Sequence, residues 1–159
     1  MFGGAKTYFD TLPRASFSGI IFPLTRWKVH GGIRDHVHEF PHAPGGAPEK
    51  LGRKLYTITC TAKFHTTFPL YPDLYPTNLN KLVQLWEQET TADFRVPTLV
   101  TTIKAYCFNW TRDSEARIRS GESVDLEFRE DQSSAFLTDA LTSSDDTALA
   151  TAAVTLSQA

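Results

Sequence analysis

The sequence lacks the long apolar runs and the reactive motifs that mark membrane proteins and several classes of enzyme. No segment approaches the roughly 20 consecutive apolar residues of a membrane-spanning helix, and no basic segment with an apolar core opens the chain, so we expect neither a membrane protein nor a signal peptide. The spacings GxSxG, HExxH, GxGxxG and that of a phosphate-binding loop are also missing. These absences favour a protein without catalytic residues or a cofactor.

Cysteine is scarce, and its placement argues against both metal binding and redox chemistry. Only Cys60 and Cys107 are present, each inside a predicted strand and neither in a CxxC motif. We expect both to be reduced and buried, with a single cross-strand disulfide as the alternative. This usage suits assembly in a cytoplasm.

Histidines gather at one place, His36, His38 and His42, where a strand would put the first two on one face. A zinc site needs further committed ligands and a second shell of partners, and no cysteine or acidic residue is placed to complete one. We therefore interpret them as strand and loop residues and expect no metal.

The composition predicts one folded domain with two unlike ends. The chain has 159 residues, of which 41% are hydrophobic and 12% aromatic, enough for a core. The net charge is only -2, yet residues 1–63 hold nine Lys/Arg against four Asp/Glu, and residues 113–159 hold three against ten. The plain interpretation is two solvated faces. The sharper one is a head-to-tail ring, in which the basic patch of one subunit meets the acidic patch of the next.

The N-terminal part predicts a flexible arm followed by strands. Residues 1–13 show no periodicity and would order only on a partner. Short alternation predicts strands over residues 14–22 and 24–29, with a bulge or kink at Gly19 and Pro23.

A hairpin and a loop should follow. The Gly31-Gly32 pair predicts a tight turn that leads to a returning strand over residues 34–40. Residues 41–52 carry three prolines and three glycines, which predicts a long loop without regular structure.

Clearer periodicity appears in the second half. Residues 56–64 alternate strictly and predict a half-buried strand; residues 78–91 show helical spacing, with Thr77 or Asn78 as the N-cap. Further strands are expected over residues 98–110 and 124–128. The fold class is mainly β (α+β), an antiparallel β-barrel or sandwich with one amphipathic helix. Composition shifts near residue 131, so residues 14–131 form the domain and 132–159 a Ser/Thr/Ala/Asp-rich extension, helical or disordered.

Two charged groups are candidates for a subunit interface. The best basic patch is Arg53-Lys54 with Lys50 and Lys63, which we rank first as a subunit contact. On the acidic side stand Asp125 and Glu127, which alternate along the last strand. Together with Glu130 they are interpreted as a solvated strand face and not as paired catalytic carboxylates, because no apolar pocket encloses them.

Several short motifs occur together in a specific order: RASFSGIIF from residue 14, VHEFP from residue 37, LGRK from residue 51 and VDLEF from residue 124. In this order the chain resembles the N-terminal domain of phage DNA circularisation proteins over residues 14–131. It departs from the family at Val96-Pro97, where His-Pro is usual, at residues 91–95, which replace a glycine-rich approach, and in lacking the long C-terminal region after residue 159.

The resemblance implies a structural protein of the virion. It implies a fold like that of tail-tube and distal tail proteins, and a hub or adaptor ring, a hexamer by analogy, between the tail tube and the tip of a phage baseplate. The implied partners are other copies, the tail tube protein, other baseplate or hub proteins and the tape-measure protein; no membrane is involved, and nucleic acid only passes through the lumen.

Two other functions remain open. A nucleic-acid-binding protein that handles or circularises genome ends has only the family name and the Arg53 patch in its favour, and the modest net charge argues against it. A receptor- or carbohydrate-binding module is suggested by Trp27 and Trp110, which stand at predicted strand ends.

Overall fold

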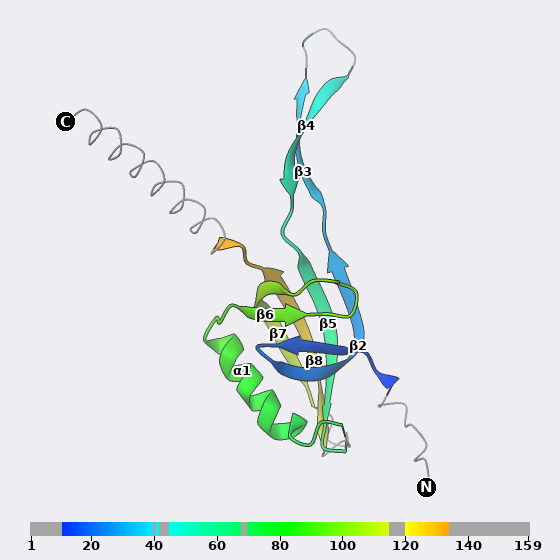
Figure 1. Cartoon of the computed structure of the whole chain (residues 1–159), viewed down its shortest axis with the longest axis vertical. Coiled ribbons are helices and arrows are strands. Elements are labelled where there is room, and N and C mark those ends of the chain that lie inside the picture. Colours follow the sequence, from blue (N-terminus) through cyan, green and yellow to red (C-terminus); the bar gives the residue numbers. More distant parts are fainter. Residues whose placement is uncertain (1–10, 40, 42–44, 68–69, 115–119, 134–159) are drawn as a thin grey trace, which may run out of the picture.

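Six strands close into an antiparallel barrel, and two more form a hairpin that projects from it (Figure 1). This computed structural model describes residues 11–39, 41, 45–67, 70–114 and 120–133. Around the barrel the strand order is β1-β2-β5-β8-β7-β6, while β3 and β4 pair only with each other. The elements are β1 (Arg14–Phe17), β2 (Ile20–His30), β3 (Ile33–Glu39), β4 (Gly46–Arg53), β5 (Thr57–His65), η2 (Leu74–Asn78), α1 (Leu79–Glu87), β6 (Ala92–Arg95), β7 (Ile103–Asp113) and β8 (Gly121–Glu130).

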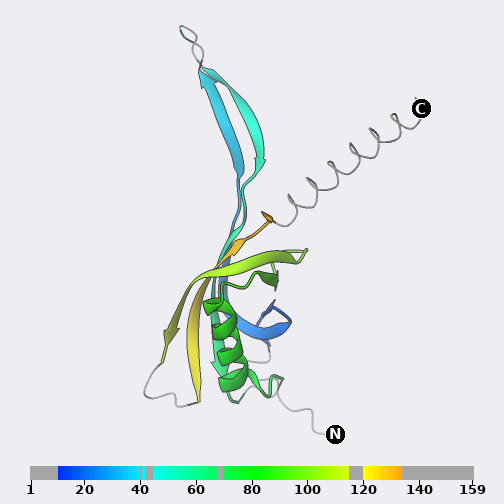
Figure 2. The ribbon, with the colours of Figure 1, turned by 90° about the vertical axis from the view of Figure 1, so that its left-hand side faces the viewer.

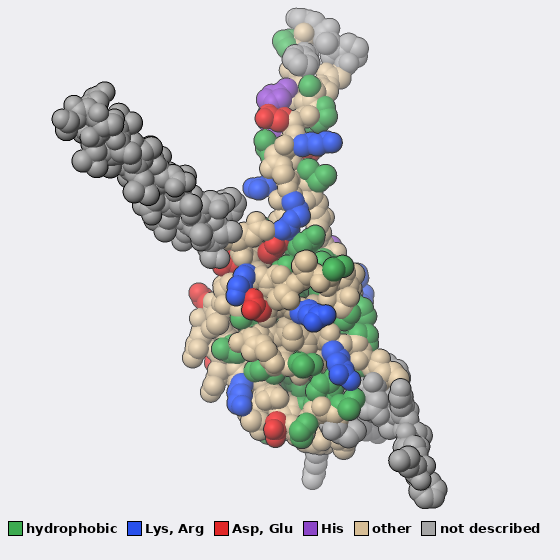
Figure 3. Space-filling view, viewed as in Figure 1, with side chains coloured by type: hydrophobic (Ala, Val, Ile, Leu, Met, Phe, Trp, Pro, Cys, Tyr) green, Lys and Arg blue, Asp and Glu red, His purple; other side chains and the backbone are tan. Residues whose placement is uncertain are grey.

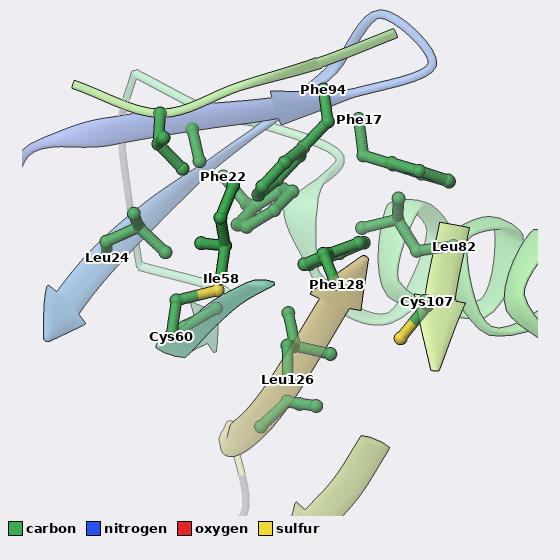
Figure 4. Close-up of a cluster of buried hydrophobic side chains, with 14 of the residues drawn as sticks. Phe17, Phe22, Leu24, Ile58, Cys60, Leu82, Phe94, Cys107, Leu126 and Phe128 are labelled. Carbon is green, nitrogen blue, oxygen red and sulfur yellow. The ribbon is translucent and has the colours of Figure 1, made fainter. Parts of the chain in front are cut away.

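Along the strands of the barrel, side chains alternate between the inside and the outside, and the inward-pointing ones fill the core. In β5 the residues Ile58, Cys60, Ala62 and Phe64 are buried, and in β8 Val124, Leu126 and Phe128 are buried, as the period-two pattern predicts. Aromatic rings occupy the centre (Figure 4), where Phe94 stacks on Phe128 with 4.1 Å between ring centroids. The predicted fold class, mainly β with one amphipathic helix, is confirmed.

Helix α1 packs against the barrel and buries Leu79, Leu82 and Trp86 (Figure 2). It is shorter than the predicted span of 78–91, because it ends at Glu87 and Glu89 adopts a left-handed backbone with φ of 53°. The short segment η2, which is kinked at the extended residue Tyr75, leads directly into it. The N-cap Asn78 therefore already has helical dihedrals, and its side chain makes no capping hydrogen bond. No helix among the described residues combines the length and the apolarity that crossing a membrane requires.

The start of the barrel differs from the predicted kinked pair of strands. The strands β1 and β2 form a hairpin whose turn is Ser18-Gly19. Both turn residues are left-handed, with φ of 51° and 80°, and Gly19 takes this conformation without steric cost. Pro23 lies inside β2, at the point where the strand changes partner from β1 to β5, and a bulge follows between Leu24 and Arg26.

The hairpin predicted at Gly31-Gly32 is wrong, and so is the long loop over residues 41–52. The chain passes through the two glycines in extended form: β2 pairs with β5, and β3 pairs with β4, which runs from Gly46 to Arg53. Pro48 is tolerated because β4 has one partner strand only, and Gly52 takes a φ of 94° where the register shifts. The result is the β3–β4 hairpin, which extends β2 and β5 beyond the barrel (Figure 1).

The third difference concerns residues 92–113. A short strand β6, which sequence reasoning missed, precedes Pro97 and pairs with both β1 and β7. The predicted strand over residues 98–110 is replaced by a loop over residues 98–102 and by β7, which continues to Asp113. Most of the predicted N-terminal arm (residues 1–10) and of the C-terminal extension (residues 134–159) lies outside the described residues.

Candidate subunit interface

Four strands of the barrel form a sheet whose two outer strands have open edges. In the order β2-β5-β8-β7 every neighbouring pair is antiparallel. Within the described part of the chain, β1 pairs with β2 only as far as Pro23, and β6 pairs with β7 only as far as Ala105. The Leu24 N–H still donates to the Pro13 carbonyl, at 2.7 Å. Beyond Leu24 in β2, and beyond Ala105 in β7, no further strand pairs with the outer edge in the described part of the chain, and such an edge is a template for another strand.

Polar side chains cover the face of this sheet that points away from the core. They come from all four strands and line one shallow depression: Arg26 and Lys28 on β2, Thr59 and Thr61 on β5, Asp125 and Glu127 on β8, Asn109 and Thr111 on β7. The hydroxyl of Thr61 donates to the Asp125 carboxylate at 2.6 Å. Within this depression the side chains thus change from basic on β2 to neutral on β5, acidic on β8 and neutral on β7. Further along the same face, Lys63 on β5 and Asp113 on β7 are exposed.

The candidates Asp125 and Glu127 both lie on this face, as expected for a solvated strand. Asp125 is exposed and Glu127 is half-buried, with only a long contact of 3.5 Å to the Arg129 guanidinium. Glu130, however, was grouped with them wrongly. Its position is in phase with Leu126 and Phe128, and its side chain is only 4% exposed.

Glu130 instead joins the barrel to the base of the hairpin. The Arg53 guanidinium donates two hydrogen bonds to its carboxylate, at 2.6 and 2.7 Å, and the backbone N–H of Tyr56 donates a third at 2.8 Å. The amide of Gln132 donates a fourth at 2.9 Å. Chiefly because of the Arg53 hydrogen bonds, the pKa of Glu130 falls to about 2.

Arg53 is therefore held within its own molecule and is not a free member of a basic patch. Its guanidinium also lies over the Tyr56 ring, 4.4 Å from the centroid. A side chain at Gly31 would meet that ring at 2.8 Å, so glycine is required where β2 leaves the barrel beside Tyr56. The side chains that sequence reasoning combined as one basic patch are divided between this clamp, the surface of the hairpin and β5 of the barrel, which carries Lys63.

Two further basic candidates belong to the hairpin surface. Lys50 is exposed on β4, opposite Asp35, and Lys54 follows β4 with its backbone N–H donating to Gly32. No ion pair among the described residues joins either lysine to Asp125 or Glu127 in the same molecule. These two lysines and the acidic candidates are thus on separate surfaces, as a head-to-tail contact requires.

Every residue of β3 and β4 is exposed, including apolar ones (Figure 3). About half of the surface of Ile33 (57%), Val37 (50%) and Leu51 (52%) faces solvent. A two-stranded hairpin of this kind is marginal in water by itself, so its exposed apolar side chains indicate a contact surface.

The predicted histidine and cysteine residues fall outside any reactive site. His36 and His38 share a face of β3, with ring centroids 4.7 Å apart, and Nε2 of His38 lies 2.9 Å from the Glu49 carboxylate; His42 is not among the described residues. In the described ranges no group of three or more His, Cys, Asp or Glu side chains could hold a metal ion. Cys60 and Cys107 are free and buried, as predicted.

The two tryptophans proposed as a sugar platform are not free at strand ends. Trp27 and Trp110 are half-buried and pack against the core. The indole N–H of Trp27 donates to the Thr98 hydroxyl, and the Trp110 ring lies 6.2 Å from that of Trp86. Stacking on a sugar would require both rings to leave these contacts.

Comparison with solved structures places this barrel among known folds. The chain matches the SPP1 Dit protein, described as a hub adsorption apparatus in phages that infect Gram-positive bacteria, with a TM-score of 0.52 and 13% identity over 75% of this chain and 49% of that one. It thus spans about half the length of the Dit chain. A chain of a native gene transfer agent particle matches with a TM-score of 0.52 and 12% identity, over 81% of this chain and 96% of that one. At such low identity the likeness shows a shared fold.

Family membership comes from the sequence itself. No curated protein matches the chain significantly. The model of the family described as DNA circularisation protein N-terminus matches residues 11–102, which are more than half of the chain and include β1 to β6 with α1. The chain belongs to the DNA circularisation protein N-terminus family.

Proposed function

We propose that the protein is a non-enzymatic structural component of a phage tail, and that it forms a hub or adaptor ring between the tail tube and the tip of the baseplate. The observation that carries the proposal is the antiparallel sheet β2-β5-β8-β7, whose outer strands are paired with β1 and β6 over only part of their length. Its natural partner is another copy of the same sheet.

Because the sheet has an even number of strands, its two edge strands can pair antiparallel in a head-to-tail contact between copies. Because directions alternate across four strands, β2 and β7 run in opposite directions. A rotation about an axis along the strands preserves these directions, so β2 of a neighbouring copy would pair antiparallel with β7. Such a heterologous contact closes into a ring when the rotation closes.

Charge on the outward face supports the same arrangement. In a continuous sheet the basic pair Arg26 and Lys28 of β2 and the acidic pair Asp125 and Glu127 of β8 would alternate. At the level of the depression, uncharged side chains of β5 or β7 separate each pair from the next. Every basic strand would then have an acidic strand two positions away on both sides, at roughly 10 Å. Copies joined in any other order lose this alternation.

The β3–β4 hairpin supplies a second surface, for the adjoining tail component. It lies beyond the barrel along the strand direction, which is the axial direction of the proposed ring (Figure 2). Its exposed Val37 and Leu51 would be covered by the next protein along the tail, such as the tail tube or a baseplate protein. The related folds of the Dit protein and the gene transfer agent particle agree with this place in the virion.

Cryo-electron microscopy of purified phage tails tests the proposal. The expected map shows a closed ring of this chain, a hexamer by analogy with the family, in which β7 of each copy pairs with β2 of the next. Copies that meet through other surfaces would contradict the sheet argument, and tails without the protein would contradict the function. The ring is expected at the junction between the tail tube and the tip.

A further inference from the structure

An aromatic groove opens beside the free edge of β7. It lies between the end of α1 and the inner side of β7, and both Trp86 and Trp110 line it, with Cys107 between them and Phe108 and Tyr106 at its side. The rim carries Glu87 and Glu89, which form no ion pair within the described ranges.

Trp86 adds a second sign that the groove takes an occupant. Its side chain is 3% exposed, and its Nε1 is the one buried side-chain nitrogen or oxygen in the described part of the chain without a hydrogen-bond partner. A buried donor without an acceptor is unfavourable. A segment with backbone carbonyls that entered the groove could supply the acceptor.

The opposite side of the molecule carries a matching projection. The loop over residues 98–102 lies beside the edge of β2, where Thr98 accepts the hydrogen bond from the Trp27 indole (Figure 1). At its tip Val100 is 97% exposed, the highest value among the large hydrophobic side chains that the structure describes. Arg95, just before this loop, is exposed and has no ion pair among the described residues.

The strand register places the loop over residues 98–102 and the aromatic groove at the same height along the strand direction. Trp27 is opposite Cys60, Cys60 is opposite Leu126, and Leu126 is opposite Trp110, so one transverse row of the sheet joins the two tryptophans. All four side chains belong to the core side of the sheet. When β2 of a second copy pairs in register with β7, the loop above Trp27 therefore comes to the mouth of the groove.

We infer that the loop over residues 98–102 of one copy inserts Val100 into the aromatic groove between α1 and β7 of the next copy. The occupant is a second copy of this chain, and the inference rests on the proposed head-to-tail ring. The exposed valine gains an apolar site lined by Trp86 and Trp110, and Arg95 of the entering copy approaches Glu87 and Glu89.

Cysteine cross-linking tests the contact directly. One chain carries Val100→Cys and the other Glu87→Cys, and the two are mixed under mild oxidation where the wild type assembles. Both chains also carry Cys107→Ala, because Cys107 lines the groove and could itself capture the thiol at position 100. Cys60 is buried and lines no part of the groove, and burial raises its pKa to about 12, so it stays protonated. Lys81→Cys, exposed on α1 outside the groove, replaces Glu87→Cys in the matched control.

The expected product is a disulfide-linked pair of chains that forms only in the Val100→Cys plus Glu87→Cys mixture. Rings that show no cross-linking above the Lys81→Cys control would overturn this inference and leave the ring itself intact. If light scattering finds the wild type monomeric at all concentrations and tails show no contact between copies, both the ring and the inference are overturned.

A substitution gives an independent readout. Val100→Asp leaves the monomer folded, because the side chain contacts solvent, and should raise the apparent dissociation constant of assembly at least about tenfold by placing a carboxylate beside the tryptophans and Glu87. Leu70→Asp, at another exposed apolar residue outside both surfaces, should leave assembly unchanged. Assembly of Val100→Asp at wild-type concentrations would overturn the inference.

Discussion

At the scale of single residues, the buried carboxylate of Glu130 is the most consequential side chain. Glu130→Gln keeps the shape but removes the charge that Arg53 and the Tyr56 N–H face. We expect the free energy of unfolding at pH 7 to fall by about 2 kcal/mol, because charge-assisted hydrogen bonds at a buried site are lost. Urea denaturation followed by tryptophan fluorescence measures the change.

The pH dependence of that difference identifies its cause. The folded-state pKa of Glu130 is about 2 against an ordinary 4.5, so its stabilising effect is complete above about pH 4.5 and disappears as the pH falls toward 2. The gap between wild type and Glu130→Gln should shrink over this window. Glu127→Gln is the control: its contact at 3.5 Å predicts a change below about 0.5 kcal/mol. A gap that stays constant from pH 7 to 3 would contradict the ion-pair explanation.

The two thiols allow a second prediction at this scale. Burial raises the pKa of Cys60 and Cys107 to about 12. At pH 8 the thiolate fraction is then about a thousandfold below that of a free cysteine, so alkylation by iodoacetamide should be slower by at least that factor in the folded protein than in urea. Mass spectrometry of the alkylated chain measures both rates. Rapid labelling without denaturant would show that the barrel opens locally.

Some of these residues could be predicted and some could not. The burial of both cysteines follows from the alternation of their strands, and it was predicted. The burial of Glu130 could also have been predicted, because the residue continues the alternation of Val124, Leu126 and Phe128. It was assigned to the solvated face because its side chain is charged. Its partner Arg53 lies 77 positions away, and no local pattern gives that pairing.

Among the elements, the β3–β4 hairpin should be separable from the fold. Replacing residues 34–52 by an Asn-Gly turn keeps Arg53, and hence its clamp on Glu130, and every described side chain that it removes is exposed. We expect the free energy of unfolding to change by less than about 1 kcal/mol. The shortened chain should still form rings but should no longer join them to the adjoining tail component, which negative-stain microscopy of reconstituted tails would reveal. Unfolding of this variant would show that the hairpin supports the barrel.

The same hairpin shows which elements a sequence can predict. Strands β5 and β8 and helix α1 have one buried and one wet face, so their periodicity is visible along the chain. Strand β4 buries nothing and contains Pro48, so it has no pattern to detect. The turn predicted at Gly31-Gly32 failed for another reason, since glycine signals freedom of the backbone and does not specify which strands pair.

At the scale of the whole molecule, the strand order places residues from the basic and the acidic parts of the sequence on one face of the sheet. The basic N-terminal part contributes Arg26 and Lys28 to β2, and the acidic C-terminal part contributes Asp125 and Glu127 to β8. Sequence reasoning correctly assigned Asp125 and Glu127 to a wet strand face, but it placed the basic surface at Arg53. Only the strand order shows that Arg26 and Lys28 share the acidic residues' face, because that order brings residues about a hundred positions apart into one sheet.

This alternation predicts how charge controls assembly. The double variant Arg26→Glu with Lys28→Glu should fold with a free energy of unfolding within about 0.5 kcal/mol of wild type, since both side chains are exposed. In the ring it would place acidic strands two positions from the acidic β8 on both sides, and assembly should weaken at least about tenfold in low salt. Adding Asp125→Lys and Glu127→Lys inverts all four charges that line the depression and should restore the ring. Sedimentation velocity at two salt concentrations compares the three proteins, and equal assembly of the double variant and the wild type in low salt would contradict the continuous sheet.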